Sequence, residues 1–240
     1  MFENVEKFEL GTGHIGVLFV RYTITINRKD MKNMKREIPK QRPEEIQEIW
    51  PGQFSMFSHF DCATAVPQVL YMLTTRKPDG RVNACFQSWT AFGGDNDVFY
   101  AVMAGLLRSG HSYQNIVREK EFCVNFLSPA YYDACMKTIE VNKDDVDELA
   151  AAGLTAEAAV CVKAPRVAEA FLTYECRLVS DEALGDSKDL RLIVGEVLNA
   201  AQDEGVKTRN SICSDNGFMY YVQVENQHGG VAGLKDLRDA

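Results

Sequence analysis

Residues 67–126 read PQVLYMLTTRKPDGRVNACFQSWTAFGGDNDVFYAVMAGLLRSGHSYQNIVREKEFCVNF, and this stretch decides the fold. It opens with an apolar β-type run over residues 69–75 and continues into a tight-turn sequence. Pro78 presets φ in such a turn, and Gly80 accepts a positive φ that other residues resist. The chain is therefore expected to fold back here into a second strand that begins near Arg81.

The same stretch contains two more β-type runs, over residues 98–104 and 122–126. Between them the sequence predicts a short helix over residues 113–120, with Ser112 placed to cap it. We expect the cluster Gly93-Gly94-Asp95 to form the turn before the third strand. Strands that are separated only by turns or by one short helix favour an antiparallel sheet.

Hydroxyl and amide side chains gather in two loops, each at the end of an apolar strand. Residues 87–90 form the first loop, and Ser112 stands in the second. Hydroxyl groups and the free N–H groups at the start of a helix can bind an anion without a cluster of lysines. Ordinary turn chemistry accounts for the same residues, because Ser, Thr and Asn populate loops for local reasons. From the residues alone both interpretations stay open.

The rest of the chain predicts further strands with short helices between them, which favours a closed or partly split antiparallel barrel. Glu175 is expected on the solvent face of one strand, because it alternates with apolar neighbours such as Cys176. Gly195 is expected to mark a bulge or a close approach, and Gly153 the end of a helix. The predicted strands cover residues 54–57, 168–178, 190–201 and 218–224, and the predicted helices cover residues 130–138 and 143–152.

Composition excludes several classes of function. The net charge of −8 argues against nucleic acid or an anionic membrane as a partner, because both require a basic surface. The seven cysteines contain no C-x-x-C pair and are odd in number, so neither a disulfide framework nor a zinc site is predicted. The four histidines show no metal-binding spacing, and we expect no metal. The cysteine pattern is typical of a reducing cytoplasm, which is the expected location.

The start of the chain contains a misleading motif. Residues 11–16, GTGHIG, match the G-x-G-x-x-G fingerprint of dinucleotide sites. That fingerprint opens a helix, but residues 17–26 are β-branched and strand-like, so we reject it. The same run is too short to span a bilayer, and its acidic upstream flank does not fit a signal peptide. We therefore expect no membrane segment.

The order of motifs along the chain resembles the flavin reductase-like FMN-binding split-barrel family, and specifically its flavoredoxin-like branch. The similar stretch covers about residues 54–224, and its specificity comes from the order of the motifs and not from any one of them. The motifs are Pro67 before Thr74-Thr75, Asp79-Gly80 before Asn83-Ala84, Ser88 to Thr90, His111 to Ile116, Glu121 to Phe126, Ala152 to Thr155, Ala164-Pro165-Arg166, Tyr174-Glu175-Cys176 and Val194 to Val197.

The resemblance implies a mainly β (α+β) fold, a split antiparallel β-barrel with a few short peripheral helices. It implies an FMN-dependent oxidoreductase that passes hydride or electrons from a nicotinamide or another donor through bound FMN. The alternative is a flavoredoxin-type electron carrier that works with protein partners and does not oxidise NAD(P)H. A third reading is a flavin-storage module without turnover. No nicotinamide motif is present, so the sequence does not name the reductant. The family pattern also implies a homodimer.

The resemblance further implies which residues surround the cofactor. A first group lies along the flavin, a second forms one phosphate-side loop, and a third forms the other loop with two assisting side chains. No catalytic residue is assigned, because the flavin carries the chemistry. The alternative is that Asn83 is a turn residue and Trp89 a packing anchor. The three groups are Asn83, Ala84, Cys85 and Phe86, then Ser88, Trp89 and Thr90, then Ser112 and Asn115 with Arg108 and His111.

The first thirty residues have no counterpart in the family pattern. Met31 begins a run that reads like a natural start, so we expect residues 1–30 to be translated upstream sequence. Against this, residues 17–26 have the composition of a strand that could pair with an edge of the barrel. The expected division is an N-terminal arm over residues 1–50, the split-barrel domain over residues 51–228 and a tail over residues 229–240.

Overall fold

The computed structural model describes residues 35–205 and 217–233. The chain divides into residues 1–37 and residues 38–240, and every helix and strand below belongs to the second unit. The predictions for residues 1–30 lie outside the described residues.

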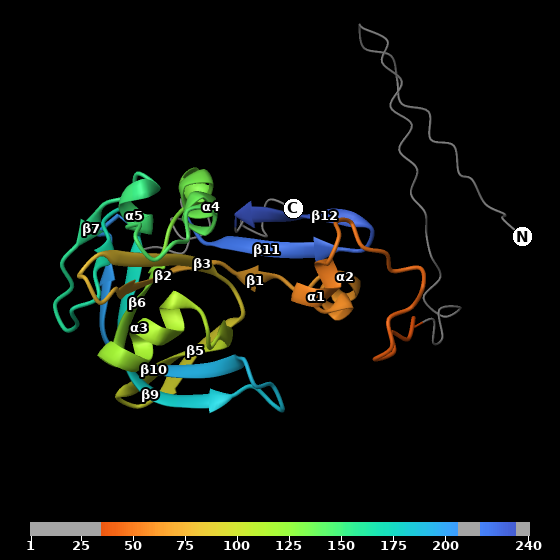
Figure 1. Cartoon of the computed structure of the whole chain (residues 1–240), viewed down its shortest axis with the longest axis horizontal. Coiled ribbons are helices and arrows are strands. Elements are labelled where there is room, and N and C mark those ends of the chain that lie inside the picture. The colour runs from red at the N-terminus through yellow and green to blue at the C-terminus, as the bar shows by residue number, and fades with distance from the viewer. Residues whose placement is uncertain (1–34, 206–216, 234–240) are drawn as a thin grey trace, which may run out of the picture. The chain divides into compact units, whose positions relative to one another are not determined.

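A seven-stranded sheet forms the centre of the second unit (Figure 1). Its strands stand in the order β3-β2-β6-β9-β10-β5-β4, and neighbouring strands are antiparallel throughout. The bounds are β2 Tyr71–Arg76, β3 Val82–Gln87, β4 Thr90–Asp95, β5 Val98–Leu107, β6 Glu121–Phe126, β9 Leu172–Ala183 and β10 Leu190–Gln202.

The two edge strands of this sheet are consecutive in the chain. β3 ends at Gln87 and β4 begins at Thr90, so only Ser88 and Trp89 lie between them. Three residue steps span at most about 10 Å, which brings these two strand ends close together. The sheet therefore curls into a split antiparallel barrel, and the predicted fold class is confirmed.

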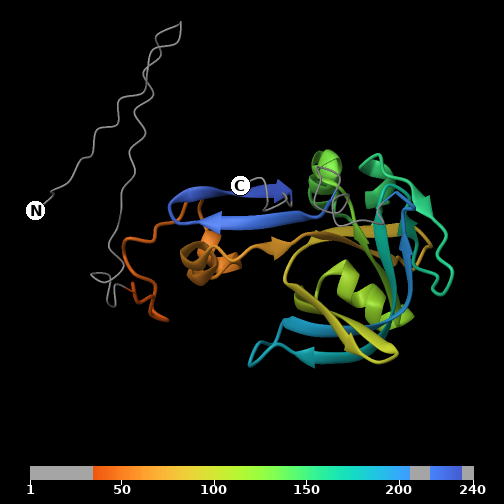
Figure 2. The ribbon, with the colours of Figure 1, turned by 180° about the vertical axis from the view of Figure 1, so that it is seen from behind.

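Smaller elements surround this barrel (Figures 1 and 2). β1, β11 and β12 form a three-stranded sheet, and β7 pairs with β8. Helix α3 lies within the curl of the large sheet, against β2, β3 and β6. The bounds are α1 Gln53–Met56, α2 His59–Thr64, β1 Gln68–Val69, α3 His111–Glu119, η1 Pro129–Tyr131, α4 Tyr132–Glu140, α5 Glu148–Ala151, β7 Ala156–Glu157, β8 Arg166–Val167, β11 Met219–Val224 and β12 Gln227–Gly233.

Strand β2 is buried on both of its faces. Tyr71 and Leu73 belong to a hydrophobic cluster within the curled sheet. Met72 points the other way, into a second cluster that includes Cys135 of α4 and Leu149 of α5. A strand that is covered on both sides carries apolar residues on both faces, which is why Tyr71, Met72 and Leu73 follow one another without alternation. The turn that follows is also as predicted: Gly80 has φ 88°, and the N–H of Lys77 donates to the carbonyl of Arg81 at 2.8 Å.

Two predicted elements are wrong. The sequence predicts a strand over residues 54–57, but helix α1 forms there after Gly52. Gln53 is the first residue of this helix, and its buried amide donates to Gln223 of the distant strand β11 at 3.3 Å. The turn predicted at Gly93-Gly94-Asp95 is instead part of β4, and the reversal falls at Asn96 with φ 52°.

Glu175 also corrects the sequence prediction. It is 0% exposed on β9, although the alternation of β9 places it opposite the hydrophobic cluster that contains Cys176. The second face of β9 is covered by the segment that connects β7 to β8, and the N–H of Cys161 in this segment donates to the carboxylate of Glu175 at 2.6 Å. Alternation identified the two faces, but it did not reveal what covers the second one.

The ends of the second unit extend beyond the predicted domain. Ile46 is 1% exposed, although it lies in the predicted arm. Asn226 holds this segment, because its amide donates to the carbonyl of Glu45 and accepts from the N–H of Gln47. Strand β12 continues to Gly233, beyond the predicted start of the tail. Within residues 35–205 and 217–233, no helix has the length and apolar character that a membrane crossing requires.

Candidate functional site

Helix α3 begins two residues earlier than predicted. Its N-cap is Gly110, which offers no side-chain hydrogen bond, and Ser112 is the second residue of the helix and not its cap. Gln114 is the first residue whose N–H bonds back along the helix, to the carbonyl of Gly110 at 3.1 Å. The N–H groups of the first turn therefore have no side-chain cap. Such a helix start carries a partial positive charge and favours an anion.

The Ser112 side chain is turned towards strand β3. It is 6% exposed, and its Oγ accepts a hydrogen bond of 2.9 Å from Nδ2 of Asn83, which is 2% exposed. Cys85 lies on the same face of β3, because side chains two residues apart share a face. Burial raises the pKa of the Cys85 thiol, which also interacts with Ser112. The structure thus brings three predicted residues together at the start of α3.

The other two β3 residues of the predicted set face away from α3. Ala84 and Phe86 belong to the second hydrophobic cluster, with Met72 of the neighbouring strand. Their side chains are therefore part of the core, and only their backbone can contribute to a site on the α3 side.

Asn115 lies one helical turn after Ser112 and is also buried. Its Nδ2 donates to Oγ1 of Thr75 at 3.1 Å, and its Oδ1 accepts from Nη1 of Arg118 at 2.9 Å. Both ends of this amide are engaged within the protein. Asn115 therefore holds α3 against β2.

The loop that contains Ser88, Trp89 and Thr90 lies at the other end of β3. The Thr90 hydroxyl donates to the carbonyl of Val102 at 2.9 Å, and the Trp89 ring packs over Gly105. No hydrogen bond between described residues joins this loop to Ser112. Four residue steps of strand separate Asn83 from Gln87, or about 13 Å. The two predicted loops thus lie at opposite ends of one strand face and are not gathered at a single point.

His111 and Arg108 differ in their surroundings. Nε2 of His111 lies 2.7 Å from Oδ1 of Asp144, while its Nδ1 is buried and has no partner among the described residues. Arg108 is exposed, and its backbone N–H donates to the carbonyl of Asp189 at 2.7 Å. His111 therefore belongs to the start of α3, whereas the Arg108 side chain is directed to the surface.

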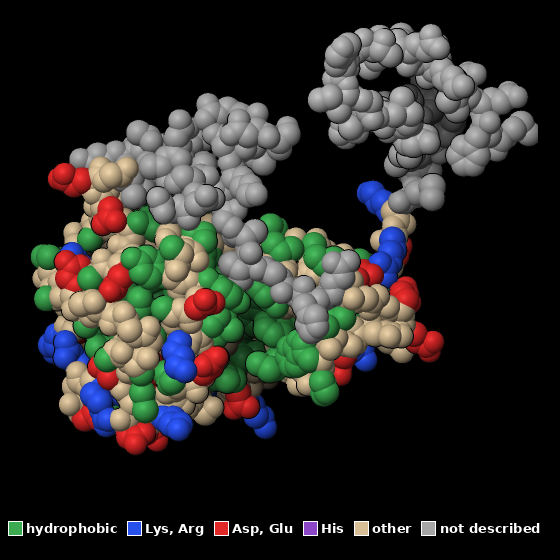
Figure 3. All heavy atoms as spheres, turned by 90° about the horizontal axis from the view of Figure 1, so that it is seen from above, with side chains coloured by type: hydrophobic (Ala, Val, Ile, Leu, Met, Phe, Trp, Pro, Cys, Tyr) green, Lys and Arg blue, Asp and Glu red, His purple; other side chains and the backbone are tan. Residues whose placement is uncertain are grey.

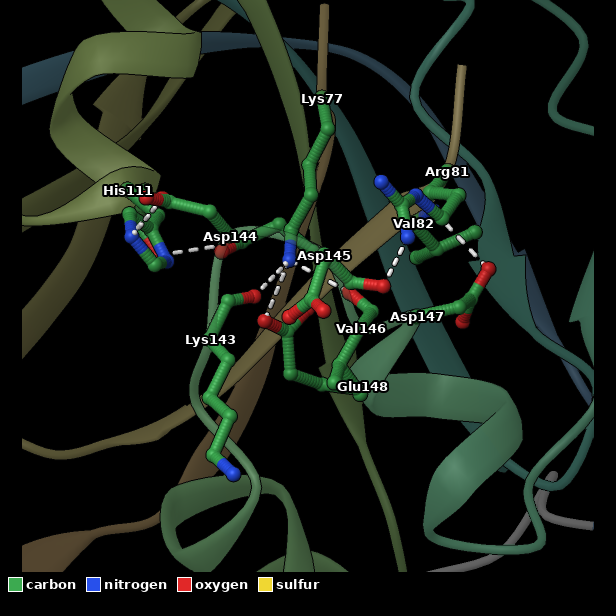
Figure 4. A network of polar contacts seen from close by, with 12 residues as sticks. Lys77, Arg81, Val82, His111, Lys143, Asp144, Asp145, Val146, Asp147 and Glu148 are labelled. Atoms are coloured by element: carbon green, nitrogen blue, oxygen red, sulfur yellow. Dashed lines mark hydrogen bonds and ion pairs between the residues drawn. The ribbon is translucent and has the colours of Figure 1, made fainter. Parts of the chain in front are cut away.

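A segment that sequence reasoning missed lies beside His111 (Figure 4). We call residues 143–148 the acidic strap. Lys77 holds it in place: its Nζ donates to the carbonyls of Lys143 and Val146 and to Oε1 of Glu148, at 2.6, 2.5 and 2.6 Å. The predicted helix is therefore shorter, from Glu148 to Ala151, because the carbonyls before it bond to Lys77. The Lys-Asp-Asp-Val-Asp-Glu run was visible in the sequence, but its partner Lys77 was not.

A cavity of 350 Å³ lies between the strap, α3 and the β2–β3 turn. Its lysine and arginine side chains already have partners: Lys77 bonds to Glu148, Arg81 to Asp79 and Arg118 to Glu119. Nε2 of His111 lies against Asp144. The strap adds carboxylates to the cavity rim. The cavity is therefore less suited to an anion than the uncapped start of α3.

These features define the class of protein: a split barrel in which an uncapped helix starts beside a buried hydroxyl. The chain belongs to the flavin reductase like domain family, whose model matches residues 63–223. A relative from Aquifex aeolicus (strain VF5), described as an uncharacterized protein, is 33% identical over 108 residues. That match covers 45% of this chain and 50% of the relative, so the chain spans about half the length of the curated relative it matches.

Solved structures share the fold. Nitrilotriacetate monooxygenase component B from Bacillus cereus has a TM-score of 0.63 at 17% identity, over 79% of this chain and 97% of that chain. Flavoredoxin of Desulfovibrio vulgaris (Miyazaki F) has a TM-score of 0.59 at 20% identity, over 70% and 88%. The FMN-binding protein from Thermus thermophilus has a TM-score of 0.59 at 18% identity, over 85% and 99%. At these identities the likeness shows the common split-barrel fold.

Proposed function

We propose that the chain binds FMN and acts as a flavin reductase-like oxidoreductase. The observation that carries the proposal is the Ser112 hydroxyl, buried at the uncapped start of α3 in a chain of the flavin reductase like family. Solved structures that share the fold include a flavoredoxin and an FMN-binding protein.

The residues present fit this cofactor. A phosphate needs donors at one end, which the first-turn N–H groups of α3 and Ser112 supply. The ring system needs an apolar surface at the other end, and Trp89 stands there. One elongated ligand along the β3 face would contact both loops.

The flavin supplies the redox chemistry when bound, so no nucleophile or acid–base pair is required of the protein. The chain's contribution is to bind the flavin and to orient it. Ser112 and the start of α3 fix one end of the ligand, and β3 presents its backbone along the length. Because burial raises the pKa of Cys85, its thiol stays uncharged at neutral pH and places no anion on this face.

A second candidate is an electron carrier without nicotinamide oxidation. The likeness to a flavoredoxin supports it. The two candidates share the FMN site and differ only in the reductant.

The test is an absorbance spectrum of the purified full chain, with FMN added, before and after anaerobic NADH or NADPH. We expect a flavin spectrum, with FMN identified by mass spectrometry of the released ligand, that is bleached by a nicotinamide nucleotide. Bound FMN that is reduced only by a partner protein would favour the carrier. A chain with no affinity for FMN would contradict both candidates.

A further inference from the structure

We propose that Asn83 is a positioning residue that turns the Ser112 hydroxyl into a donor for the phosphate, and so favours phosphorylated flavin over riboflavin. This inference rests on the proposed function. It gives Asn83 a role that acts through Ser112 and not by contact with the flavin.

The bond between Asn83 and Ser112 has a fixed direction. An amide nitrogen donates and cannot accept, whereas a serine hydroxyl has one proton and two lone pairs. Nδ2 of Asn83 donates to Oγ of Ser112 at 2.9 Å, which occupies one lone pair of the hydroxyl. The Ser112 proton must therefore point away from Asn83. A hydroxyl that could otherwise rotate freely becomes a donor with a set direction.

Burial makes this arrangement persistent. Asn83 and Ser112 are 2% and 6% exposed, so water does not compete for the bond. Near Ser112 the described side chains offer the thiol of Cys85, which is a weak acceptor. A phosphate oxygen at the start of α3 is a much stronger acceptor, because the bond is then charge-assisted.

Asn115, which also lies between α3 and the sheet, has a different set of hydrogen bonds from Asn83. Its amide donates to Thr75 and accepts from Arg118, so both of its polar atoms are bonded within the protein. Among the residues that the structure describes, the Asn83 side chain has one hydrogen bond, and its partner is Ser112. Asn83 thus acts on a group at the helix start, and Asn115 holds the helix to the sheet.

The test is a double-mutant cycle on the full chain, with FMN and riboflavin as the probes. The proteins are the parent, Asn83→Leu, Ser112→Ala and the double variant, and the dissociation constant is measured by flavin fluorescence. We expect Ser112→Ala to weaken FMN binding roughly ten- to a hundred-fold, the loss of one charge-assisted bond. Asn83→Leu should weaken it by about ten-fold. The double variant should bind FMN like Ser112→Ala, and riboflavin affinity should stay within about two-fold throughout.

Additive losses would overturn the inference, because they would mean that Asn83 acts independently of Ser112. Equal losses for FMN and riboflavin would also overturn it, because they would mean a general structural effect. If Asn83→Leu does not fold, Asn83→Asp replaces it, since aspartate accepts the Ser112 proton. Asn115→Asp is then the matched control: it adds the same charge one helical turn away. Asn83→Asp should lose at least ten-fold more FMN affinity than Asn115→Asp, and equal losses contradict the inference.

A parent chain that binds neither flavin contradicts the proposed function and this inference together. A parent that binds FMN, with additive variants, contradicts this inference alone.

Discussion

Glu175 shows at the scale of one residue how this barrel stabilises a buried carboxylate. It accepts hydrogen bonds from the backbone of Val160 and Cys161 and from the side chains of Arg166 and Asn199. Burial alone would raise its pKa, but these donors hold the pKa below its usual value. The carboxylate therefore fastens the segment between β7 and β8 to the barrel.

We expect Glu175→Gln to lower the free energy of unfolding by about 3–5 kcal/mol at pH 7, because Arg166 is left without its charge partner. The folded-state pKa of Glu175 is lowered, so its contribution is complete above the unfolded carboxyl pKa of about 4.3 and is lost as pH falls through the folded value. The difference in unfolding free energy between the parent and Glu175→Gln should therefore become smaller below about pH 4. Urea unfolding followed by circular dichroism at pH 7, 5 and 3.5 measures this gap.

Glu157→Gln is the matched control, because Glu157 is exposed on β7. It should change the free energy of unfolding by less than about 0.5 kcal/mol. A gap for Glu175→Gln that is the same at every pH would show that its charge does not matter.

The link between β3 and β4 shows what an element contributes. Trp89 has φ 58°, and its ring packs over Gly105, which has φ 78°. A Cβ on Gly105 would lie 2.5 Å from the Trp89 ring. Glycine at position 105 of β5 therefore leaves room for the indole of Trp89 to pack at the end of β3.

Gly105→Ala and Gly80→Ala form a matched pair, because both positions have positive φ but only Gly105 lies against a side chain. Gly80→Ala should cost about 1–2 kcal/mol of unfolding free energy for the backbone strain. Gly105→Ala should cost about 1–3 kcal/mol more, because the indole must move. It should also shift tryptophan emission and weaken FMN binding. Thermal unfolding, fluorescence and FMN titration measure these effects. Identical behaviour of the two variants would remove Trp89 from the proposed site.

The acidic strap is a second element that depends on a distant partner. Lys77 and Glu148 are almost fully buried, and Oε2 of Glu148 has no partner within the part of the chain that the structure describes. Removing one charge of such a pair leaves the other unpaired in the interior. Asp147 adds a second attachment, since its carboxylate accepts from the N–H groups of Val82 and Ala150.

We expect Lys77→Met to cost about 3–5 kcal/mol of unfolding free energy and to make the strap more sensitive to limited proteolysis. The double variant Lys77→Met/Glu148→Leu should regain most of this loss, because it leaves no unpaired charge. Lys137→Met is the control: its exposed pair with Glu140 should contribute less than about 1 kcal/mol. Guanidinium unfolding gives the free energies. If the double variant is no more stable than Lys77→Met, the unpaired charge of Glu148 is not the cause of the lost stability.

Exposed hydrophobic side chains form part of the surface of the whole molecule. Hydrophobic side chains gather in a hollow on the face shown in Figure 3. Met56 and Val66, which flank helix α2, are 66% and 56% exposed. The neighbouring Phe57 ring packs edge-on against Trp89, with 6.3 Å between the two ring centroids. Exposed apolar groups beside the proposed flavin site are typical of an interface.

The family resemblance implies a homodimer, and we expect its interface to use the α1–α2 region. Light scattering at micromolar concentration should give twice the mass of the chain. Met56→Glu with Val66→Glu should yield a monomer, because two charges would be buried at the interface. Ile139→Glu, at an exposed apolar position of α4, should leave the dimer intact. A parent that is monomeric under these conditions contradicts the expectation.

Elements whose signals are local could be predicted from the sequence. The Pro78-Asp79-Gly80 turn, the long strands β5 and β10 and the close approach at Gly195 all follow from residues within a few positions of one another. At Gly195 a Cβ would collide with the Phe122 ring, and the register of β10 shifts beside it. The family resemblance, which depends on the order of motifs, was also available from the chain alone and is confirmed.

The pairing of polar groups depends on the tertiary fold. Ser112 bonds to Asn83, 29 positions away, and Lys77 to Glu148, 71 positions away. Glu175 looked solvent-facing because its cover comes from another segment, and residues 54–56 lie in helix α1, whose first residue Gln53 bonds to β11. The physical reason is the same in each case. A side chain's local pattern reports the face it occupies, whereas its burial and its hydrogen-bond partners are set by segments that reach it only when the sheet has curled.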